Sequence, residues 1–340
     1  MLGRRLIVKS PNFWNDKDSL CTKILYPISR TYGLIKAIQY NRVIAERVKA
    51  PVVCIGDIVV NGAGKTIAVA MVCRMLEKRG YKPHILSGKN GGYIRNVVRV
   101  DPNRHSYLQV GDEAILSSFV YPLWIGKDKI AAADAAISSG ADVIVIDGGL
   151  QNNEVAKNFK ILVMDSMQGI GNGNIYPAGF LKEDIKTGVK KADIVLIVGD
   201  KNEVLEKIIL NIVPNMRIFY SVIEPIDGEK KLSPGEKVIA FCGIGSPAKF
   251  KKTLNEMKLD IIDFVSFPDH HPYTITESQK LVKVARNANA KLVTTMKDYI
   301  KIPDPFKNEV SVVDVKLSFT CDSFEDIMIK ALSSDGWSSG

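Results

Sequence analysis

The chain has 340 residues, enough for two domains, and its composition of 46% hydrophobic and 24% charged residues excludes a disordered or fibrous protein. Its five cysteines are scattered without CxxC spacing, which argues against a zinc site and is typical of free thiols in a reducing cytoplasm. The formal net charge of +9 favours anionic partners.

The N-terminal region has no long apolar core followed by a cleavage site, and we expect no signal peptide. No uncharged run reaches the roughly 18 residues that a spanning helix needs. Within Thr22–Lys49, Ile24, Ile28, Tyr32 and Ile35 fall near one helical face. The segment also carries six basic residues: Lys23, Arg30, Lys36, Arg42, Arg47 and Lys49. Such a helix either lies in the headgroup layer of an anionic membrane or packs on its own domain, and periodicity alone favours packing.

A phosphate-binding loop is predicted from the stretch "PVVCIGDIVVNGAGKT", Pro51–Thr66. Its first half reads as a buried strand, and the next residues have helical spacing up to Gly80. A glycine turn between a strand and a helix can hold nucleotide phosphates at the helix N-terminus, with Lys65 on the terminal phosphates and Thr66 on Mg²⁺. The first glycine of the usual pattern is replaced by Val59, and a chance glycine turn is the alternative.

Strand-like runs alternate with helical patterns along the chain, which predicts an α/β fold with mainly parallel sheets. The expected strands are 52–58, 83–87, 143–147, 160–165, 194–198, 238–242, 261–267, 291–295 and 310–315. "DGEKKLSPGEK" has the composition of a linker, so we place a boundary there. The expected parts are an N-terminal segment 1–49, a P-loop core 50–226, a linker 227–236, a smaller α/β domain 237–332 and a frayed tail 333–340.

A second nucleotide-site element is predicted at "ADVIVIDGGLQN", where four apolar residues precede Asp147. An acid at the carboxyl end of a strand can hold Mg²⁺ beside a phosphate-binding loop. No Asn/Thr-Lys-x-Asp motif indicates a GTPase, and no interleaved basic and aromatic residues indicate nucleic-acid binding.

Three further polar clusters carry potential chemistry. Asp112 and Glu113 follow the strand-like "YLQV", and Glu183 closes the glycine-rich "GIGNGNIYPAGFLKED". Two of the chain's four histidines, His270 and His271, stand side by side in "SFPDHHPYT". A histidine pair is more often surface or capping chemistry, but here it is a candidate acid/base element.

Together these motifs resemble one family, the tetraacyldisaccharide 4′-kinases of lipid A synthesis in Gram-negative bacteria. The shared pieces are "YPIS…YG", "NGAGKT", "GDEA", "DGGLQN", "GNGNIYPAGFLKE", "FCGIGSPAKF", "FPDHHPYT" and "LVTTMKD", in the family's order from about Asn12 to Phe319. The resemblance implies a P-loop kinase with a second, smaller domain and a cleft between them. It implies transfer of the ATP γ-phosphate to the 4′-hydroxyl of tetraacyldisaccharide 1-phosphate, an anionic glycolipid. It also implies that the N-terminal helix meets the cytoplasmic face of the inner membrane, which reverses the preference from periodicity.

The resemblance also implies roles for particular residues. Asp112, paired with His270, would accept the proton of the sugar hydroxyl, and Lys65 would neutralise charge on the phosphates. Mg²⁺ would be surrounded by Thr66, Glu113, Asp147 and Glu183. The nucleotide would contact Asn61, Gly62, Ala63, Gly64, Lys65 and Thr66, and also Lys297 and Asp298 of "TxKD".

The sequence departs from the family pattern at several of these places. Gly148 stands where the family commonly has a second acid, and Asn152 where it has a histidine. Lys182 replaces an arginine and Met296 a glutamate. The alternative to an active lipid kinase is therefore a weakened or inactive relative that binds nucleotide and membrane.

Overall fold

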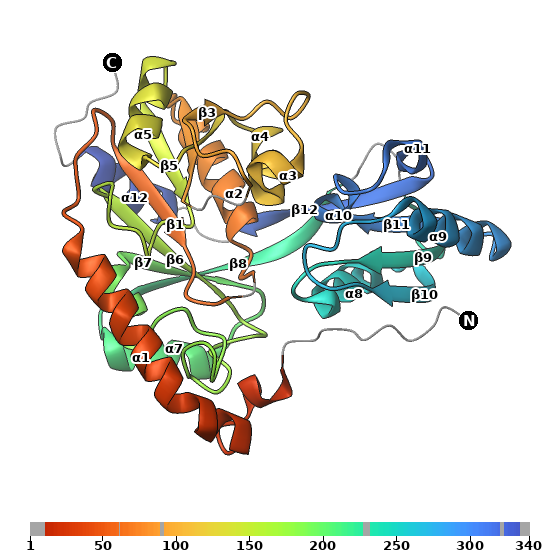
Figure 1. Cartoon of the computed structure of the whole chain (residues 1–340), viewed down its shortest axis with the longest axis horizontal. Helices are drawn as coiled ribbons and strands as arrows, with labels where there is room; N and C mark the ends of the chain where they lie inside the picture. The colour runs from red at the N-terminus through yellow and green to blue at the C-terminus, as the bar shows by residue number, and fades with distance from the viewer. Residues whose placement is uncertain (1–10, 61, 89–91, 227–231, 320–322, 334–340) are drawn as a thin grey trace. The chain divides into compact units, whose positions relative to one another are not determined.

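The computed structural model describes residues 11–60, 62–88, 92–226, 232–319 and 323–333 (Figure 1). They fall into two compact units. Of these described residues, those from 12 to 222 and from 317 onward form the larger unit, and Pro11 and those from 223 to 316 form the smaller. The chain leaves the larger unit within strand β8 (Arg217–Ile226) and returns within β12 (Val310–Phe319). The α/β class with mainly parallel strands is confirmed.

This division differs from the expected domain ranges. The boundary lies inside β8 rather than at 227–236, and the last helix belongs to the larger unit instead of the 237–332 domain. That helix, α12 (Ser323–Ser333), packs against strand β6 (Phe159–Asp165) and buries Phe324, Met328 and Leu332. Arg79, directly after helix α2 (Lys65–Lys78), forms ion pairs with Glu325 (2.5 Å) and Asp326 (3.0 Å) of α12. Part of the expected linker, 227–231, and the tail 334–340 lie outside the described residues.

The larger unit is built on a sheet whose strand order is β8-β7-β6-β1-β5-β2-β4-β3. Its strands are β1 (Val52–Gly56), β2 (Pro83–Ser87), β3 (Val98–Arg99), β4 (Leu123–Ile125), β5 (Val143–Asp147), β6 (Phe159–Asp165), β7 (Ile194–Val198) and β8. β1 runs parallel to β5 on one side and to β6 on the other, and β3 is antiparallel to β4. Both neighbours of the first strand come later in the chain, so the strand order turns at β1. Ligands of open α/β sheets bind at the carboxyl ends of the strands beside such a turning point.

The helices of the larger unit lie between or outside its strands in the chain, and α2 contacts β1, β5 and β2. They are η1 (Asn12–Asn15), α1 (Leu20–Arg42), α2 (Lys65–Lys78), α3 (Tyr107–Val110), α4 (Asp112–Ser118), α5 (Lys129–Ser138), α6 (Ile185–Lys191), α7 (Glu203–Ile212) and α12. The prediction of a strand at "YLQV" was wrong, because Tyr107–Val110 forms helix α3. Four residues are too few for helix and strand periodicity to be told apart, and a capping box between Ser106 and Gln109 favours the helix.

The smaller unit has its own parallel strands in the order β10-β9-β11-β12. Its elements are β9 (Lys237–Cys242), α8 (Pro247–Glu256), β10 (Asp260–Ser266), α9 (Ile275–Asn287), β11 (Lys291–Thr295), α10 (Met296–Tyr299), α11 (Asp304–Lys307) and β12. Two buried hydrophobic clusters contain alternate residues of β9, with Ile239 and Phe241 in one and Val238 and Ala240 in the other. The strand is therefore buried on both faces, as its unbroken apolar run predicts.

Helix α1 packs on the larger unit through small and polar residues instead of its isoleucines. Thr22 and Ser29 are buried, and Ser29 Oγ accepts a hydrogen bond from Ala178 N at 2.8 Å. By contrast, Ile24, Ile28 and Ile35 are 63%, 56% and 50% exposed. Tyr32, expected on the isoleucine face, is only half-exposed and packs edge-on against Tyr176, with ring centroids 6.0 Å apart. The helix therefore presents its apolar side to solvent.

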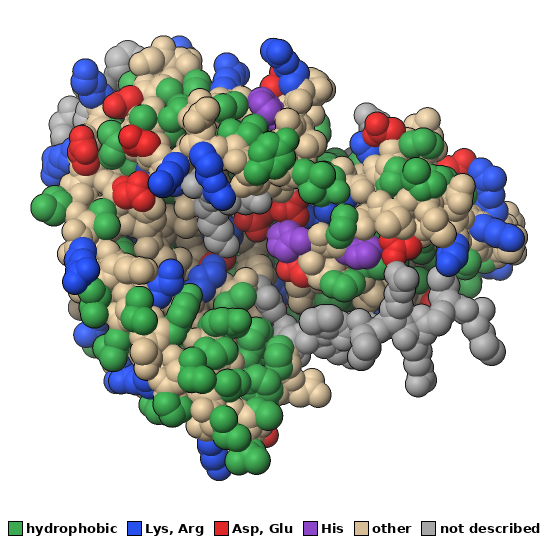
Figure 2. All heavy atoms as spheres, viewed as in Figure 1, with side chains coloured by type: hydrophobic (Ala, Val, Ile, Leu, Met, Phe, Trp, Pro, Cys, Tyr) green, Lys and Arg blue, Asp and Glu red, His purple; other side chains and the backbone are tan. Residues whose placement is uncertain are grey.

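Figure 2 shows hydrophobic side chains gathered where Figure 1 places the first turns of α1 and the neighbouring loop. The exposed large apolar residues of the helix are Leu20, Ile24, Tyr26, Ile28, Leu34, Ile35 and Ile38, and Val43 and Ile44 follow it. Each of the six basic residues noted in Thr22–Lys49 is also exposed. None of the helices in the described part of the chain has both the length and the apolar character that a membrane span requires.

Candidate active site

The phosphate-binding loop predicted from sequence lies between β1 and α2. Gly64 has φ +88°, a left-handed conformation that favours glycine, and α2 begins at the next residue, Lys65. The first N–H groups of a helix have no partner within the helix and attract phosphate. Gly62, Ala63 and Thr66 flank the turn as expected, and Asn61 lies outside the described residues.

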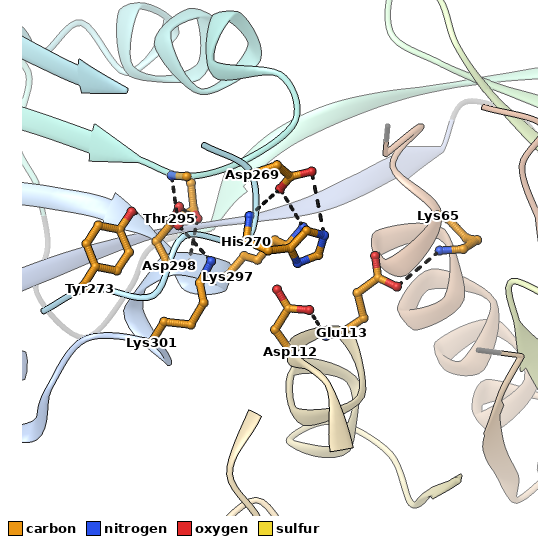
Figure 3. Close-up of polar contacts among 11 residues, drawn as sticks. Lys65, Asp112, Glu113, Asp269, His270, Tyr273, Thr295, Lys297, Asp298 and Lys301 are labelled. Atoms are coloured by element: carbon orange, nitrogen blue, oxygen red, sulfur yellow. Dashed lines mark hydrogen bonds and ion pairs between the residues drawn. The ribbon is translucent and has the colours of Figure 1, made fainter. Parts of the chain in front are cut away.

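Lys65 lies between two carboxylates. Its Nζ is 3.1 Å from Asp147 Oδ1 at the end of β5. It is also 4.0 Å from Glu113 Oε2 in α4, a contact drawn in Figure 3. Strand register explains the first contact, because Ile55 of β1 pairs with Asp147 of β5 and both strands end at the same level. The Asp147 and Glu113 carboxylates, with that of Asp57, raise the pKa of Lys65 although its burial opposes this.

The carboxyl group of Asp147 has a raised pKa, chiefly because it is buried, with Glu113 and Asp57 adding to the effect and Lys65 opposing it. The pKa values of Lys65 and Asp147 can both be raised. The ammonium is attracted by three carboxylates, whereas the Asp147 carboxylate is buried and is repelled by the other two. Lys182 adds a second positive charge by pairing with Asp57. Two ammonium groups then face three carboxylates, and with all five ionised the cluster has one excess negative charge. A hard cation bound with the nucleotide would balance it.

Asp57 is a site residue that the sequence analysis missed. It follows β1 directly, is buried, and forms an ion pair with Lys182. Its backbone oxygen accepts a hydrogen bond from Gln151 Nε2 at 2.8 Å. The available signal was its position, because an acid one residue beyond the strand before a phosphate-binding loop lies at the ligand edge of the sheet.

Glu183 has a different setting from the other expected metal ligands. Its carboxylate accepts from Gln151 Nε2 (2.8 Å) and pairs with Lys191 Nζ (2.6 Å). The Lys191 ammonium in turn lies 3.8 Å from the ring centroid of Tyr40 in α1. Among the described residues, no three His, Cys, Asp or Glu side chains form a group that could hold a metal ion. The structure brings Asp147 and Glu113 to Lys65, and it places Glu183 in a link between the P-loop side and α1.

Asp112 and His270 lie in different units, and each has a defined local setting. Asp112 is the first residue of α4 after Gly111, and its carboxylate accepts from Glu113 N at 2.9 Å. His270 has a left-handed backbone with φ +59°, and Lys297 Nζ approaches its Nε2 at 3.5 Å. Lys297 Nζ also contacts Asp269 at 3.2 Å (Figure 3).

Comparison with known sequences decides the family. The model of the family described as tetraacyldisaccharide-1-P 4′-kinase matches residues 21–333. The chain belongs to this family. It is 33% identical over 316 residues to a tetraacyldisaccharide 4′-kinase of Rhodospirillum centenum, with 92% of this chain and 93% of the relative covered. It is 35% identical to the enzyme of the same name from Paramagnetospirillum magneticum, with 93% and 96% covered.

The fold agrees with a solved family member. The crystal structure of LpxK from Aquifex aeolicus, described as in complex with ATP, superposes with a TM-score of 0.71 at 20% identity and covers 92% of this chain and 100% of that one. The resemblance noted from the motifs is thus confirmed, and the chain is a member of a family of kinases.

Asp298 of this kinase family member has a setting unlike the nucleotide contact expected of it. Its side chain is 0% exposed, and both of its oxygens accept hydrogen bonds from protein groups. Lys297, expected beside it at the nucleotide, is partly exposed and meets Asp269 and His270 instead. Only Lys297 of the two therefore has a side chain that a ligand could reach.

Proposed function

We propose that this protein transfers the γ-phosphate of ATP to the 4′-hydroxyl of tetraacyldisaccharide 1-phosphate, the acceptor that its relatives' names describe. The observation that carries the proposal is Lys65, held between Asp147 and Glu113 at the start of the helix after β1. Phosphoryl transfer is accelerated mainly by positioning and by charge stabilisation around the phosphates. A buried ammonium at a helix N-terminus supplies both.

The proposed reaction forms a bond between the sugar oxygen and the γ-phosphorus and breaks the bond between that phosphorus and the β–γ bridging oxygen. Lys65 neutralises charge on the phosphoryl oxygens, and the loop from Gly62 to Gly64 supplies backbone N–H groups. Asp112 accepts the proton of the 4′-hydroxyl, and His270 orients and tunes that transfer. The products are ADP and the 4′-phosphorylated glycolipid.

The residues around Lys65 fit Mg²⁺. Asp147 and Glu113 provide two carboxylates and Thr66 a hydroxyl, and the excess negative charge of the cluster favours a divalent cation. Mg²⁺ commonly uses one or two protein carboxylates and completes its shell with phosphate and water oxygens. When bound, it would neutralise charge on the nucleotide phosphates.

Helix α1 supports a membrane location for the acceptor. Its isoleucines face solvent and basic side chains accompany them, a combination that favours insertion at the surface of an anionic bilayer. A glycolipid with four acyl chains stays in the membrane, so the kinase has to reach it there. We place the protein at the cytoplasmic face of the inner membrane, where ATP is available, and we propose no nucleic-acid partner.

The test is a transfer assay with γ-labelled ATP and tetraacyldisaccharide 1-phosphate in mixed micelles, resolved by thin-layer chromatography. We expect a labelled lipid product with the unmodified protein and a loss of about 10²–10⁴-fold in Asp112→Asn. Absence of product from a folded protein that binds ATP would favour a nucleotide- and membrane-binding relative without activity.

A further inference from the structure

The carboxylate of Asp298 joins three separate segments of the smaller unit. Oδ1 accepts hydrogen bonds from Gly243 N (2.9 Å) and Tyr273 Oη (3.0 Å), and Oδ2 accepts from Thr295 Oγ1 (2.7 Å) (Figure 3). The Lys301 ammonium lies 3.3 Å from Oδ1, and both charged side chains are buried. The Lys301 ammonium makes no hydrogen bond to the described residues and contributes its charge, so the three hydrogen bonds to the carboxylate are what hold these segments in one arrangement.

Gly243 connects this carboxylate to the backbone of His270. Its N–H donates to Asp298, and its carbonyl accepts from His270 N at 3.1 Å. A Cβ at this position would lie 2.9 Å from Pro268 O and 3.1 Å from both Asp298 Oδ1 and His271 Cβ. Only glycine leaves room for such a close approach, and the single residue Gly243 links the buried carboxylate to the loop that carries His270.

Tyr273 connects the same carboxylate to the other side of the loop. Its ring meets His271 edge-on with centroids 5.0 Å apart, and Phe267 at 5.1 Å. His271 in turn stacks on Phe267, with centroids 4.6 Å apart. Burial and the neighbouring Asp298 carboxylate raise the pKa of the Tyr273 hydroxyl, which stays a donor. Phe267 and His271 thus pack on a ring whose hydroxyl is bonded to Asp298.

His270 needs such support because its φ of +59° is uncommon for a residue with a side chain. Its imidazole is largely exposed and is flanked by Lys297 and Asp269. Lys297 is the residue before Asp298 in α10, so fixing Asp298 also fixes the starting point of the Lys297 side chain.

We propose that Asp298, neutralised by Lys301, is a positioning residue that sets the geometry of His270 and Lys297. It acts through Gly243 and Tyr273 and touches no substrate. The inference rests on the proposed catalytic role of His270. It assigns Asp298 a positioning role in place of the nucleotide contact expected from the sequence.

The central variant is Tyr273→Phe, which removes one hydroxyl and keeps the ring that packs on Phe267 and His271. Its matched control is Thr294→Val, which removes one buried hydroxyl from the same unit, where Thr294 Oγ1 donates to Phe241 O at 2.6 Å. We expect kcat to fall about 10- to 100-fold in Tyr273→Phe with KM for ATP unchanged, because a small misplacement of a reacting group is costly. Thr294→Val should stay within about twofold.

A second readout does not depend on activity. The chain has four histidines, and two of them, His84 and His105, lie in the larger unit and serve as internal references. In spectra of ¹⁵N-histidine-labelled protein, Tyr273→Phe should shift or broaden the imidazole signals of His270 and His271 alone. Thr294→Val should leave all four signals in place. His270→Gln assigns the key signal.

The double variant Asp298→Asn/Lys301→Met removes the ion pair without leaving a buried charge. Like Tyr273→Phe, it should lower kcat and shift or broaden the imidazole signals of His270 and His271. If it does not fold, Tyr273→Phe decides. Full activity in His270→Ala would overturn the role proposed for His270. Loss of activity in His270→Ala, with normal kcat and unchanged histidine signals in Tyr273→Phe, would overturn the positioning role alone.

Discussion

The Lys65 ammonium lies 3.1 Å from the Asp147 carboxylate, and both side chains are buried. The contact joins the first helical residue after β1 to the last residue of β5, so it depends on the parallel pairing of these two strands. It holds a cation at the proposed phosphate position before any nucleotide arrives. It also leaves each charge dependent on the other, because an unpaired charge at this depth is strongly unfavourable.

Lys65→Met should abolish phosphotransfer, with a loss of about 10²–10³-fold or more in kcat, since the charge on the phosphates is no longer neutralised. It should also lower the free energy of unfolding by about 3–5 kcal/mol at neutral pH, because Asp147 loses its partner. The pKa of Asp147 is already raised in the folded protein, so this loss should grow as the pH rises above the ordinary aspartate range and shrink in acid.

The matched control is Lys65→Met/Asp147→Asn, which removes both charges. Chemical denaturation should show most of the stability restored, while the transfer assay still shows no activity. Recovery of activity in the double variant would mean that Lys65 only compensates Asp147 and does not act on the phosphates.

Gly148→Asp should add a second carboxylate beside Asp147, and the backbone conformation at Gly148 makes this substitution costly in stability. Gly148 has φ +83°, and a Cβ there would lie 3.2 Å from Lys65 Cε. We expect Gly148→Asp and Gly148→Ala to lose about 1–2 kcal/mol of stability each from the left-handed backbone. Gly148→Asp should reach half-maximal activity at a lower Mg²⁺ concentration than Gly148→Ala does. Equal Mg²⁺ titration curves for two folded variants would exclude a metal-ligand role at this position.

The exposed face of α1 should direct membrane binding. Ile24→Ser/Ile28→Ser/Ile35→Ser is expected to reduce cosedimentation with vesicles containing anionic lipid by about tenfold or more, because apolar burial and charge attraction act together there. The control is Leu108→Ser/Val204→Ser/Ile262→Ser, which removes three comparably exposed aliphatic side chains from other elements. Binding by the unmodified protein should weaken as salt rises. Equal sedimentation of the two triple variants would contradict the assignment.

Lys129 should make stability depend on pH above neutrality. Burial lowers the pKa of this lysine to about 8, while its Nζ donates to Gly126 O at 2.7 Å. The unfolded chain therefore holds the proton more tightly between pH 8 and the ordinary lysine value of about 10.5, and the folded state gains stability as the pH rises through that window.

The measurement is the unfolding free energy of the unmodified protein minus that of Lys129→Met, taken at several pH values. It should increase by at most about 3 kcal/mol between pH 8 and 10.5. Lys127→Met, at an exposed position two residues earlier, should show no such increase. A flat difference for Lys129 would mean that its ammonium is not penalised by burial.

Several parts of the fold could be predicted from the sequence because their signals are local. The ranges 83–87, 143–147, 194–198 and 291–295 were confirmed as strands, since buried parallel strands are short, continuous apolar runs. The turn before Lys65 was equally readable, because a glycine between a strand and a helix dictates where the helix begins. Asp147 could be placed at a strand end for the same reason.

Tertiary structure decided what depends on which segments meet. No period in residues 20–42 shows that α1 packs through Thr22 and Ser29 and leaves its isoleucines in solvent, because that choice depends on hydrogen-bond partners such as Ala178, far along the chain. Likewise, nothing in the sequence around Asp298 distinguishes a ligand contact from a buried one. Lys301 follows three residues later in the chain, but Gly243 and Tyr273 come from other loops. The pairing of β9 with β11 brings the Gly243 N–H to the carboxylate.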